Sequence, residues 1–463
     1  MIKQLIAGVL FWGISFSALS MSLADARHLA SRSGFDEAPE NVIALSRLTR
    51  EEAIELILES ADTAFQVTPP VWTGQPRLFA DQDNPPGRSP SGLSRKQVNE
   101  QYRRWWRELQ DWHMAQLLHG MSPLTERMTL FWQNHFTSSW FKVRQTQLIF
   151  DQFMLLRSNA LGSYADLLKG IIRDPAMLIY LDNRSNRKGK PNENLAREIL
   201  ELFSLGVGNY TEADIKAAAR ALSGWTLDKN LDFTIDARRH DAGSKTLLGK
   251  TGPLDADDIV AIILEQNATA EFITQKFWKE FISPEPDPQE VTRLAKIFRE
   301  SDYDISGLLR AIFESGHFWA EENRGSLIKS PVQLIAGTVR SLGLEVDDKR
   351  YLVNSAKAMG QLLFNPPNVK GWPGGIAWID SSTLIARRTF VSRALRGQDM
   401  RKPGMQMQKT AQGDSFLDDL ALGVSDVDLE KILLCCAPLG AAAGTGRDNK
   451  LRALLFDPVY QLN

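Results

Sequence analysis

Residues 122–136 read SPLTERMTLFWQNHF and carry the clearest helical pattern in this chain of 463 residues. The run opens with a serine and then a proline, which suit the position before a helix and the first helical position. Leu124, Met128 and Phe131 recur at helical spacing, and His135 continues the same face. The run therefore predicts an amphipathic helix whose apolar side carries one imidazole.

Similar periodicity recurs along most of the chain, whereas the alternation typical of strands is scarce and suggests a strand only near 233–235. Thr211 followed by Asp214 forms an acidic capping box and predicts another helix start. The sequence thus predicts an all-α fold, a large multi-helix globular array with long Pro- and Gly-rich loops and at most a minor β-hairpin. Further helices are expected at 50–62, 95–119, 146–156, 162–172, 193–205, 256–265, 269–281, 288–300, 305–314, 330–341 and 351–363.

Composition excludes two broad classes of protein. A hydrophobic fraction of 43% with a formal net charge of −2 is incompatible with a disordered chain. The 54 basic and 56 acidic residues leave no cationic excess. A protein that binds nucleic acid by neutralising phosphates usually has one, so no nucleic-acid partner is expected.

The N-terminus has the features of an export signal. A lysine at position 3 precedes a long uncharged run, and Ala24-Asp25-Ala26 has the form of a cleavage site. We therefore predict a signal peptide at 1–26, with an earlier cut near Ser20 or Ser22 as an alternative. The competing interpretation, a membrane anchor, is weakened by the glycines and serines in the run. The mature protein is expected to be periplasmic or secreted and to have no membrane span.

The mature chain, 27–463, is predicted to be a single large helical domain. Three segments interrupt the helical pattern: the proline-rich 66–93, the aperiodic 226–252 and the polar 395–428. Two lobes, 27–225 and 253–463, joined by the second of these segments, are an alternative organisation.

The most informative polar pattern lies at 191–203, PNENLAREILELF. Helical spacing places Glu198 and Glu201 on a polar stripe beside an apolar face. A carboxylate partly withdrawn from water beside a second one has a raised pKa, as general acid–base catalysis requires. The alternative is a structural network around Glu198. Candidate binding residues on the same segment are Asn192, Glu193, Asn194 and Arg197.

His135 has two interpretations as well. A lone histidine on an apolar face is more often a hydrogen-bonded core residue than a ligand or a base. The sharper hypothesis places it at the floor of a cleft, as a catalytic residue together with Glu198 and Glu201.

Two loops present further candidates for binding. His240, Asp241 and Lys245 cluster in a non-helical segment, which suits either ligand binding or a surface turn. The segment 365–378, NPPNVKGWPGGIAW, is stiffened by prolines and carries Lys370 and Trp372. A tryptophan on such a loop can stack on a sugar or fill a core. The sequence has no established metal-binding motif, so no metal ligand is assigned and the cofactor stays unknown.

These motifs together resemble the domain-of-unknown-function 1800 family of bacterial proteins. The resemblance implies a secreted, mostly helical protein with no established reaction. It also implies a partner, since members often occur beside an exported family that looks like phosphatases and sulfatases, the domain-of-unknown-function 1501 family. The matching stretches are 27–35, 123–136, 174–178, 181–183, 192–198, 201–203, 206, 210–214, 223–225, 240–241, 245, 249, 329–331 and 366–373.

Three functions follow from these observations. The first is a binding or accessory protein that acts with a secreted partner enzyme or on an envelope glycan. It is favoured by the export signal, the rigid loops and the lack of a complete catalytic constellation. The second is an extracytoplasmic hydrolase or lyase that uses Glu198 and His135 for proton transfer. The third is a structural envelope protein.

Overall fold

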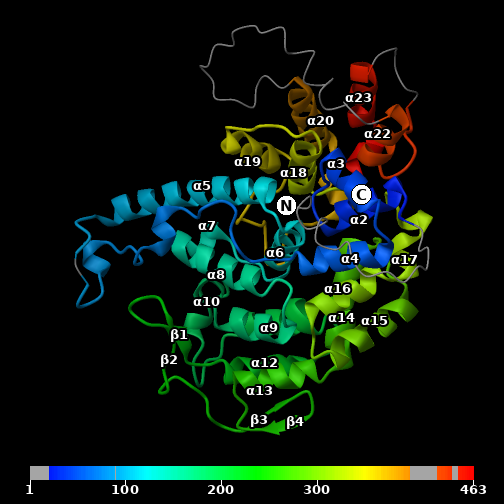
Figure 1. Cartoon of the computed structure of the whole chain (residues 1–463). Coiled ribbons are helices and arrows are strands. Elements are labelled where there is room, and N and C mark those ends of the chain that lie inside the picture. The colour runs from blue at the N-terminus through cyan, green and yellow to red at the C-terminus, as the bar shows by residue number, and fades with distance from the viewer. Residues whose placement is uncertain (1–19, 89, 397–424, 441–446) are drawn as a thin grey trace.

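The computed structural model describes residues 20–88, 90–396, 425–440 and 447–463 and is built almost entirely of helices (Figure 1). The all-α prediction is confirmed. The α2–α4 region lies beside α22 and α23, so segments from the two ends of the chain meet on one side of the molecule (Figure 1). In chain order the elements are α2 (Leu23–Ser33), α3 (Pro39–Leu45), α4 (Arg50–Glu59), η1 (Val71–Gly74), η2 (Asp81–Asp83), α5 (Arg95–His119), α6 (Pro123–His135), α7 (Trp140–Val143), α8 (Thr146–Ser158), α9 (Tyr164–Arg173), α10 (Pro175–Tyr180), η3 (Asn183–Ser185), α11 (Asn194–Glu198), η4 (Ile199–Ser204), α12 (Glu212–Ala221), β1 (Trp225–Leu227), β2 (Phe233–Ile235), β3 (Lys245–Leu247), β4 (Lys250–Gly252), α13 (Ala256–Leu264), α14 (Asn267–Phe281), α15 (Pro288–Glu300), α16 (Ile305–Phe313), α17 (Gly316–Trp319), η5 (Glu321–Asn323), α18 (Pro331–Ser341), α19 (Lys349–Ala358), η6 (Gly375–Trp378), α20 (Ser381–Arg396), α22 (Asp426–Leu433), α23 (Arg447–Phe456) and η8 (Pro458–Gln461).

Local start signals fix several of the predicted helices. Thr211 and Asp214 form the expected capping box at the start of α12. The start of α6 differs in detail, because the Ser122 hydroxyl does not cap the helix. It contacts the Thr125 hydroxyl at 2.6 Å and accepts a hydrogen bond from the Asp62 amide at 3.2 Å. The helix starts where predicted, and Ser122, just before it, links the helix to the loop at Asp62.

In the part of the chain that the structure describes, strands are confined to two antiparallel hairpins. The predicted strand, Phe233–Ile235, pairs with Trp225–Leu227, and a second hairpin joins Lys245–Leu247 to Lys250–Gly252. Both lie at the α12–α13 end of the molecule (Figure 1). The sequence predicts at most one minor hairpin, and the described residues form two.

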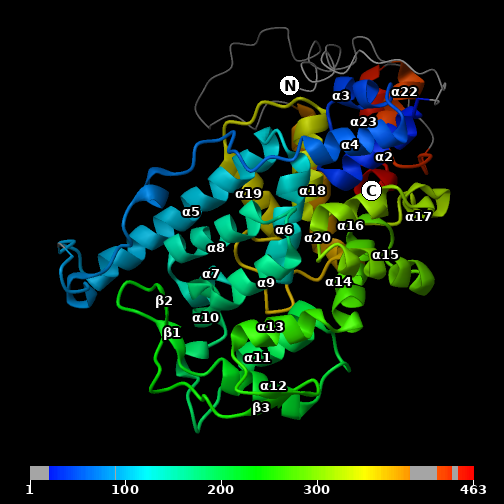
Figure 2. The same ribbon diagram turned by 60° about the horizontal axis from the view of Figure 1, so that its bottom comes forward.

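The core consists of two clusters of buried apolar residues. One is built mainly by α2–α4, α6 and α9–α17, and the other by α5, α7, α8, α18–α20, α22 and α23. Helix α6 belongs to both, since Met128 and Trp132 face the first cluster and Leu130 the second. Figure 2 shows α6 among these helices, and His135 is its last residue. Each cluster draws residues from both sides of 226–252, and the division into two lobes stays a prediction.

Helix α2 is joined to distant parts of the chain by one fully buried guanidinium. Arg32 donates hydrogen bonds to the backbone carbonyls of Phe281, Ile282, Asn323 and Asn463, at 2.8–3.0 Å. Several acceptors around one buried cation compensate for its desolvation. This explains why Arg32, within the motif at 27–35, lies in the apolar interior.

The segment that follows the predicted signal run is part of the fold. The Met21 amide donates to the Leu48 carbonyl at 2.8 Å, and Ser22 caps α2 through the Asp25 amide at 3.0 Å. Asp25 also pairs with Arg50 at 3.0 Å. Residues 1–19, most of the predicted signal peptide, lie outside the described residues, as does most of 395–428. Within the described ranges, no helix combines the length and apolar character needed to cross a bilayer.

Candidate functional site

The predicted helix at 193–205 changes its winding halfway. Residues Asn194–Glu198 are α-helical, and Ile199–Ser204 form a π-helix that closes with a bond from the Leu205 amide to the Leu200 carbonyl at 3.0 Å. A π-helical turn is rare and often marks a functional site. Here its last carbonyls accept hydrogen bonds from side chains on other helices, which satisfies groups that a helix end leaves unpaired.

His135 supplies one of these hydrogen bonds. Its Nε2 lies 3.0 Å from the Phe203 carbonyl, which also accepts from the Tyr164 hydroxyl. Its Nδ1 lies 2.9 Å from Nζ of Lys276, which donates in addition to the Leu202 carbonyl at 3.2 Å. Because a carbonyl only accepts and an ammonium only donates, the imidazole is neutral with its proton on Nε2.

Burial and the nearby Lys276 ammonium hold the pKa of His135 well below its usual range. The imidazole is 4% exposed, and both ring nitrogens are engaged. The structure thus places His135 as a hydrogen-bonded core residue, which was one of its two interpretations. A role in proton transfer would require breaking one of these contacts.

The two glutamates of the stripe have different surroundings. Glu201 accepts a hydrogen bond from the Tyr210 hydroxyl at 2.7 Å. Glu198 is half-buried, and no hydrogen bond or ion pair to its carboxylate occurs among the described residues. Burial, followed by the charge of Glu201, raises the pKa of Glu198, while Arg197 and Lys370 oppose the rise. Burial, followed by the charge of Glu198, raises the pKa of Tyr180 as well.

The remaining polar residues of the segment hold its backbone in place. Asn192 donates through Nδ2 to the Asp182 carbonyl at 3.1 Å and accepts from the Asn194 amide at 3.0 Å. Arg197 pairs with Glu193 at 3.2 Å, as the spacing predicted. It also pairs with an acidic residue at the start of α12, at 2.8 Å. Asn194 itself is exposed.

The proline-stiffened loop packs against the end of α6. The Trp372 amide donates to Oδ1 of Asn134 at 2.6 Å, and Gly371 has φ +86°. A Cβ on that glycine would lie 2.2 Å from Oδ1 of Asn134, so no other residue fits there without a shift. Trp372 is 5% exposed, which leaves no free ring face for stacking on a sugar. The tryptophan fills the core, and Lys370 is the exposed member of the pair.

The second loop lies elsewhere. Asp241 pairs with Arg220 at the C-terminal end of α12, at 2.8 Å, and His240 donates through Nδ1 to the Ser223 carbonyl at 2.8 Å. Lys245 is 2% exposed, and its ammonium donates to a backbone carbonyl at 2.9 Å. Arg197 instead contacts Glu212, at the N-terminal end of α12. Glu212 and Arg220 are eight residues apart, about 12 Å along the helix. The structure therefore does not bring this loop together with Glu198.

Three residues around the stripe escaped the sequence analysis. Lys276, on α14, pairs with His135, and Tyr180, at the end of α10, lies near Glu198. Lys142, on α7, forms an ion pair with Asp182 at 2.7 Å and has its ammonium 5.6 Å from the Tyr180 ring. No spacing in the sequence links these helices, so only the packing reveals them. Among the described residues, no group of His, Cys, Asp or Glu side chains is arranged to hold a metal ion.

The fold and this polar edge define a mostly helical protein whose α11 and η4 residues carry exposed or half-buried amide, guanidinium and carboxylate groups. The family model described as "Protein of unknown function (DUF1800)" matches residues 28–462, and the chain belongs to that family. No curated protein and no solved structure matches the chain. The family assignment agrees with the sequence resemblance and carries no reaction with it.

Proposed function

We propose that this protein is an exported binding protein and that the α11 surface recognises an uncharged, hydroxyl-rich glycan of the cell envelope. The α11 surface is defined by Tyr180, Asn194, Glu198, Glu201 and Lys370. The observation that carries the proposal is the half-buried Glu198 carboxylate, which has no hydrogen-bond partner among the described residues. A sugar hydroxyl can donate to that oxygen and accept from a neighbouring ammonium or amide.

The same geometry favours binding over hydrolysis. His135 is sealed by Lys276 and the Phe203 carbonyl, and the His240 loop contacts the far end of α12. Acid–base catalysis needs two groups within reach of one substrate. Because both ring nitrogens of His135 are engaged, the imidazole is not free to act with Glu198. The amide, carboxylate and phenol groups of the α11 surface remain available for hydrogen bonds. The partly exposed Tyr180 adds an aromatic edge suited to sugar rings.

Export is the second part of the proposal. Cleavage after Ala26 would remove the Ser22 cap and the Asp25 ion pairs of α2. We therefore propose cleavage after Ser20, where Ala18-Leu19-Ser20 also has the small-x-small form. An exported phosphatase- or sulfatase-like partner would then share the compartment.

The test is co-sedimentation of the mature protein with purified envelope polysaccharide. Glu198→Ala is expected to weaken binding roughly tenfold, because a charge-assisted hydrogen bond is lost. Glu300→Ala is the matched control, since this glutamate is 61% exposed on α15. Equal binding by wild type and Glu198→Ala would contradict the proposal, and release of reducing sugar during incubation would favour the hydrolase instead.

A further inference from the structure

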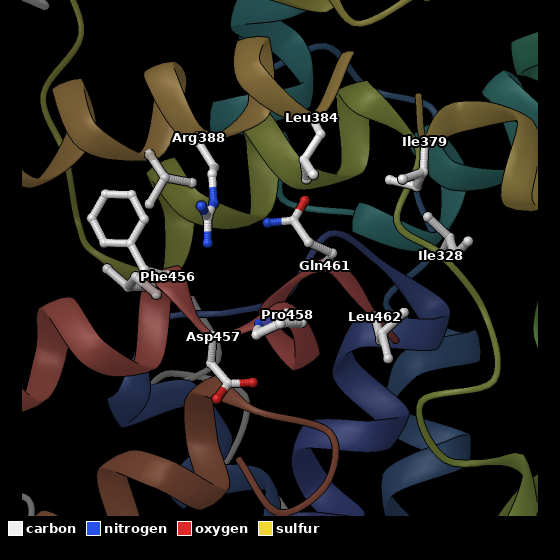
Figure 3. A pocket seen from close by; sticks show the side chains of 11 residues that line it. Ile328, Ile379, Leu384, Arg388, Phe456, Asp457, Pro458, Gln461 and Leu462 are labelled. Carbon is white, nitrogen blue, oxygen red and sulfur yellow. The ribbon is translucent and has the colours of Figure 1, made fainter. Parts of the chain in front are cut away.

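A second site lies between α20 and the C-terminal segment, apart from the α11 surface. A cavity of about 350 Å³ lies there, and Figure 3 shows side chains that line it. This volume is within the range of pockets that bind small organic molecules. Leu384, Arg388 and Val391 recur at helical spacing and present one face of α20 to it, opposite Leu455, Asp457 and Gln461.

The walls of the cavity are largely apolar. Val391 and Leu455 are buried at 1% and 0% exposure and form its inner part. Leu384 is 38% exposed at the mouth. An apolar hollow with an open apolar mouth is costly in water and is typical of a binding site.

The polar groups at the cavity divide into used acceptors and free donors. Both carboxylate oxygens of Asp457 accept backbone hydrogen bonds, from the amides of Val459 at 2.9 Å and Gly440 at 2.8 Å. The amide oxygen of Gln461 accepts from Arg387 at 3.1 Å, so its NH₂ group remains free to donate. Each of these three side-chain oxygens therefore already accepts one hydrogen bond.

Arg388 provides the positive charge. It is exposed, and it forms no ion pair or hydrogen bond within the described part of the chain. Figure 3 shows its guanidinium and the Gln461 amide extending toward each other over the cavity, while the Asp457 carboxylate points away. A ligand with an anionic acceptor group and an apolar body would satisfy both donors and cover the walls.

We propose that this cavity binds a single-chain aliphatic carboxylate, with the acyl chain along Leu384, Val391 and Leu455 and the carboxylate on Arg388 and Gln461. A peptide ending in an apolar residue also carries a carboxylate. Its backbone N–H groups would need acceptors, whereas the side-chain oxygens at the cavity each accept a hydrogen bond from the protein already and the Asp457 carboxylate points away (Figure 3). The observations thus favour an acyl chain over a peptide.

Chain length and headgroup charge give the proposal two quantitative signatures. Each added methylene that enters the cavity should raise affinity roughly fourfold, until the cavity is full. Decanoate should bind more tightly than decanol, which lacks the charge, and decyltrimethylammonium, which reverses it, should not bind.

The experiment is isothermal titration calorimetry of the mature protein with octanoate, decanoate, decanol and decyltrimethylammonium, each below its micelle concentration. Arg388→Gln is expected to weaken decanoate binding tenfold or more, and Leu384→Trp at the mouth is expected to abolish it. The control is Arg393→Gln, on the same helix, whose guanidinium packs over Tyr351 at 5.1 Å instead. It should bind as wild type does.

Several results would overturn the proposal. They are absence of decanoate binding, equal affinity for decanol or the ammonium amphiphile, tighter binding of an apolar peptide, and equal effects of Arg388→Gln and Arg393→Gln. Circular dichroism of each variant checks that it is folded. Since no residue that lines the cavity belongs to the α11 surface, glycan binding is expected to be unchanged in Arg388→Gln, and the two proposals can fail separately.

Discussion

Replacing Lys276 with methionine is expected to change how the stability of the protein depends on pH. Burial of the ammonium, followed by the charge of Lys279, lowers the pKa of Lys276 from 10.5 to about 8. Between these values the unfolded chain holds a proton that the folded protein has released. Stability of the wild type therefore rises with pH across this window as far as Lys276 contributes to it.

The magnitude follows from the two pKa values. At about 1.4 kcal/mol for each pH unit, the difference corresponds to roughly 3 kcal/mol. Methionine has no titratable group, so the variant does not gain stability with pH as the wild type does at this position. Its stability relative to wild type should therefore fall by up to about 3 kcal/mol from pH 7 to pH 10.5. At pH 7 the variant loses two hydrogen bonds, to His135 and the Leu202 carbonyl, at ~1 kcal/mol each, but is relieved of the buried charge. The net change there should lie within about 1 kcal/mol.

The assay is urea unfolding followed by tryptophan fluorescence at a series of pH values, with the variant and wild type compared at each. Lys296→Met is the control, because that ammonium is 68% exposed and its pairing is loose. Its stability difference from wild type should stay constant over the pH range. A constant difference for Lys276→Met as well would refute the reasoning, since it would mean that the ammonium is hydrated and that His135 is not sealed beneath it.

Three further predictions concern other parts of the account. Glu198→Gln should raise the melting temperature slightly at pH 7 and leave it unchanged near pH 4. The reason is that the pKa of Glu198 is raised, so the wild-type carboxylate destabilises the fold only once it is ionised. An equal effect at both pH values in differential scanning fluorimetry would contradict this. Gly371→Ala should lower the free energy of unfolding, measured in urea, by about 2–4 kcal/mol, against about 1 kcal/mol for Gly375→Ala. Both glycines have positive φ, but only the Cβ at position 371 would collide with a neighbour, Asn134. Equal losses of stability would argue against this tight contact. N-terminal sequencing of the exported protein should begin at Met21, and a start at Arg27 would show that the α2 cap is dispensable.

Helix positions could be predicted from the sequence because their signals are local. Periodicity placed α5 at the residues that the structure gives, Arg95–His119, and the Thr211 capping box marked the start of α12. Helix α2 was missed because its first turn lies in the predicted signal peptide, 1–26, and its remainder was quoted only as part of the motif at 27–35, for which no helix was predicted. The π-helical turn at Ile199–Ser204 was also missed, since its sequence is that of an ordinary amphipathic helix.

The candidate site could be predicted only in part. Sequence spacing identified the stripe with Glu198 and the Glu193–Arg197 pair, because both lie within one helix. The role of His135 depended on Lys276, 141 residues away, and the loop that carries the buried Trp372 is joined to α6 by a hydrogen bond to Asn134, 238 residues away. Contacts of this kind are set by tertiary packing, which leaves no periodic signal in a single sequence.

The most direct test of the central claim is the protonation state of His135, measured by long-range ¹H–¹⁵N NMR on protein labelled in its six histidines. The resonance is assigned by its absence in a His135→Phe variant. The sealed arrangement with Lys276 and the Phe203 carbonyl predicts a neutral ring, protonated on Nε2, whose ¹⁵N shifts do not change over the range in which a free histidine titrates, around pH 6.5. An imidazole that titrates in that range, or that carries its proton on Nδ1, would contradict the claim and return His135 to the catalytic candidates.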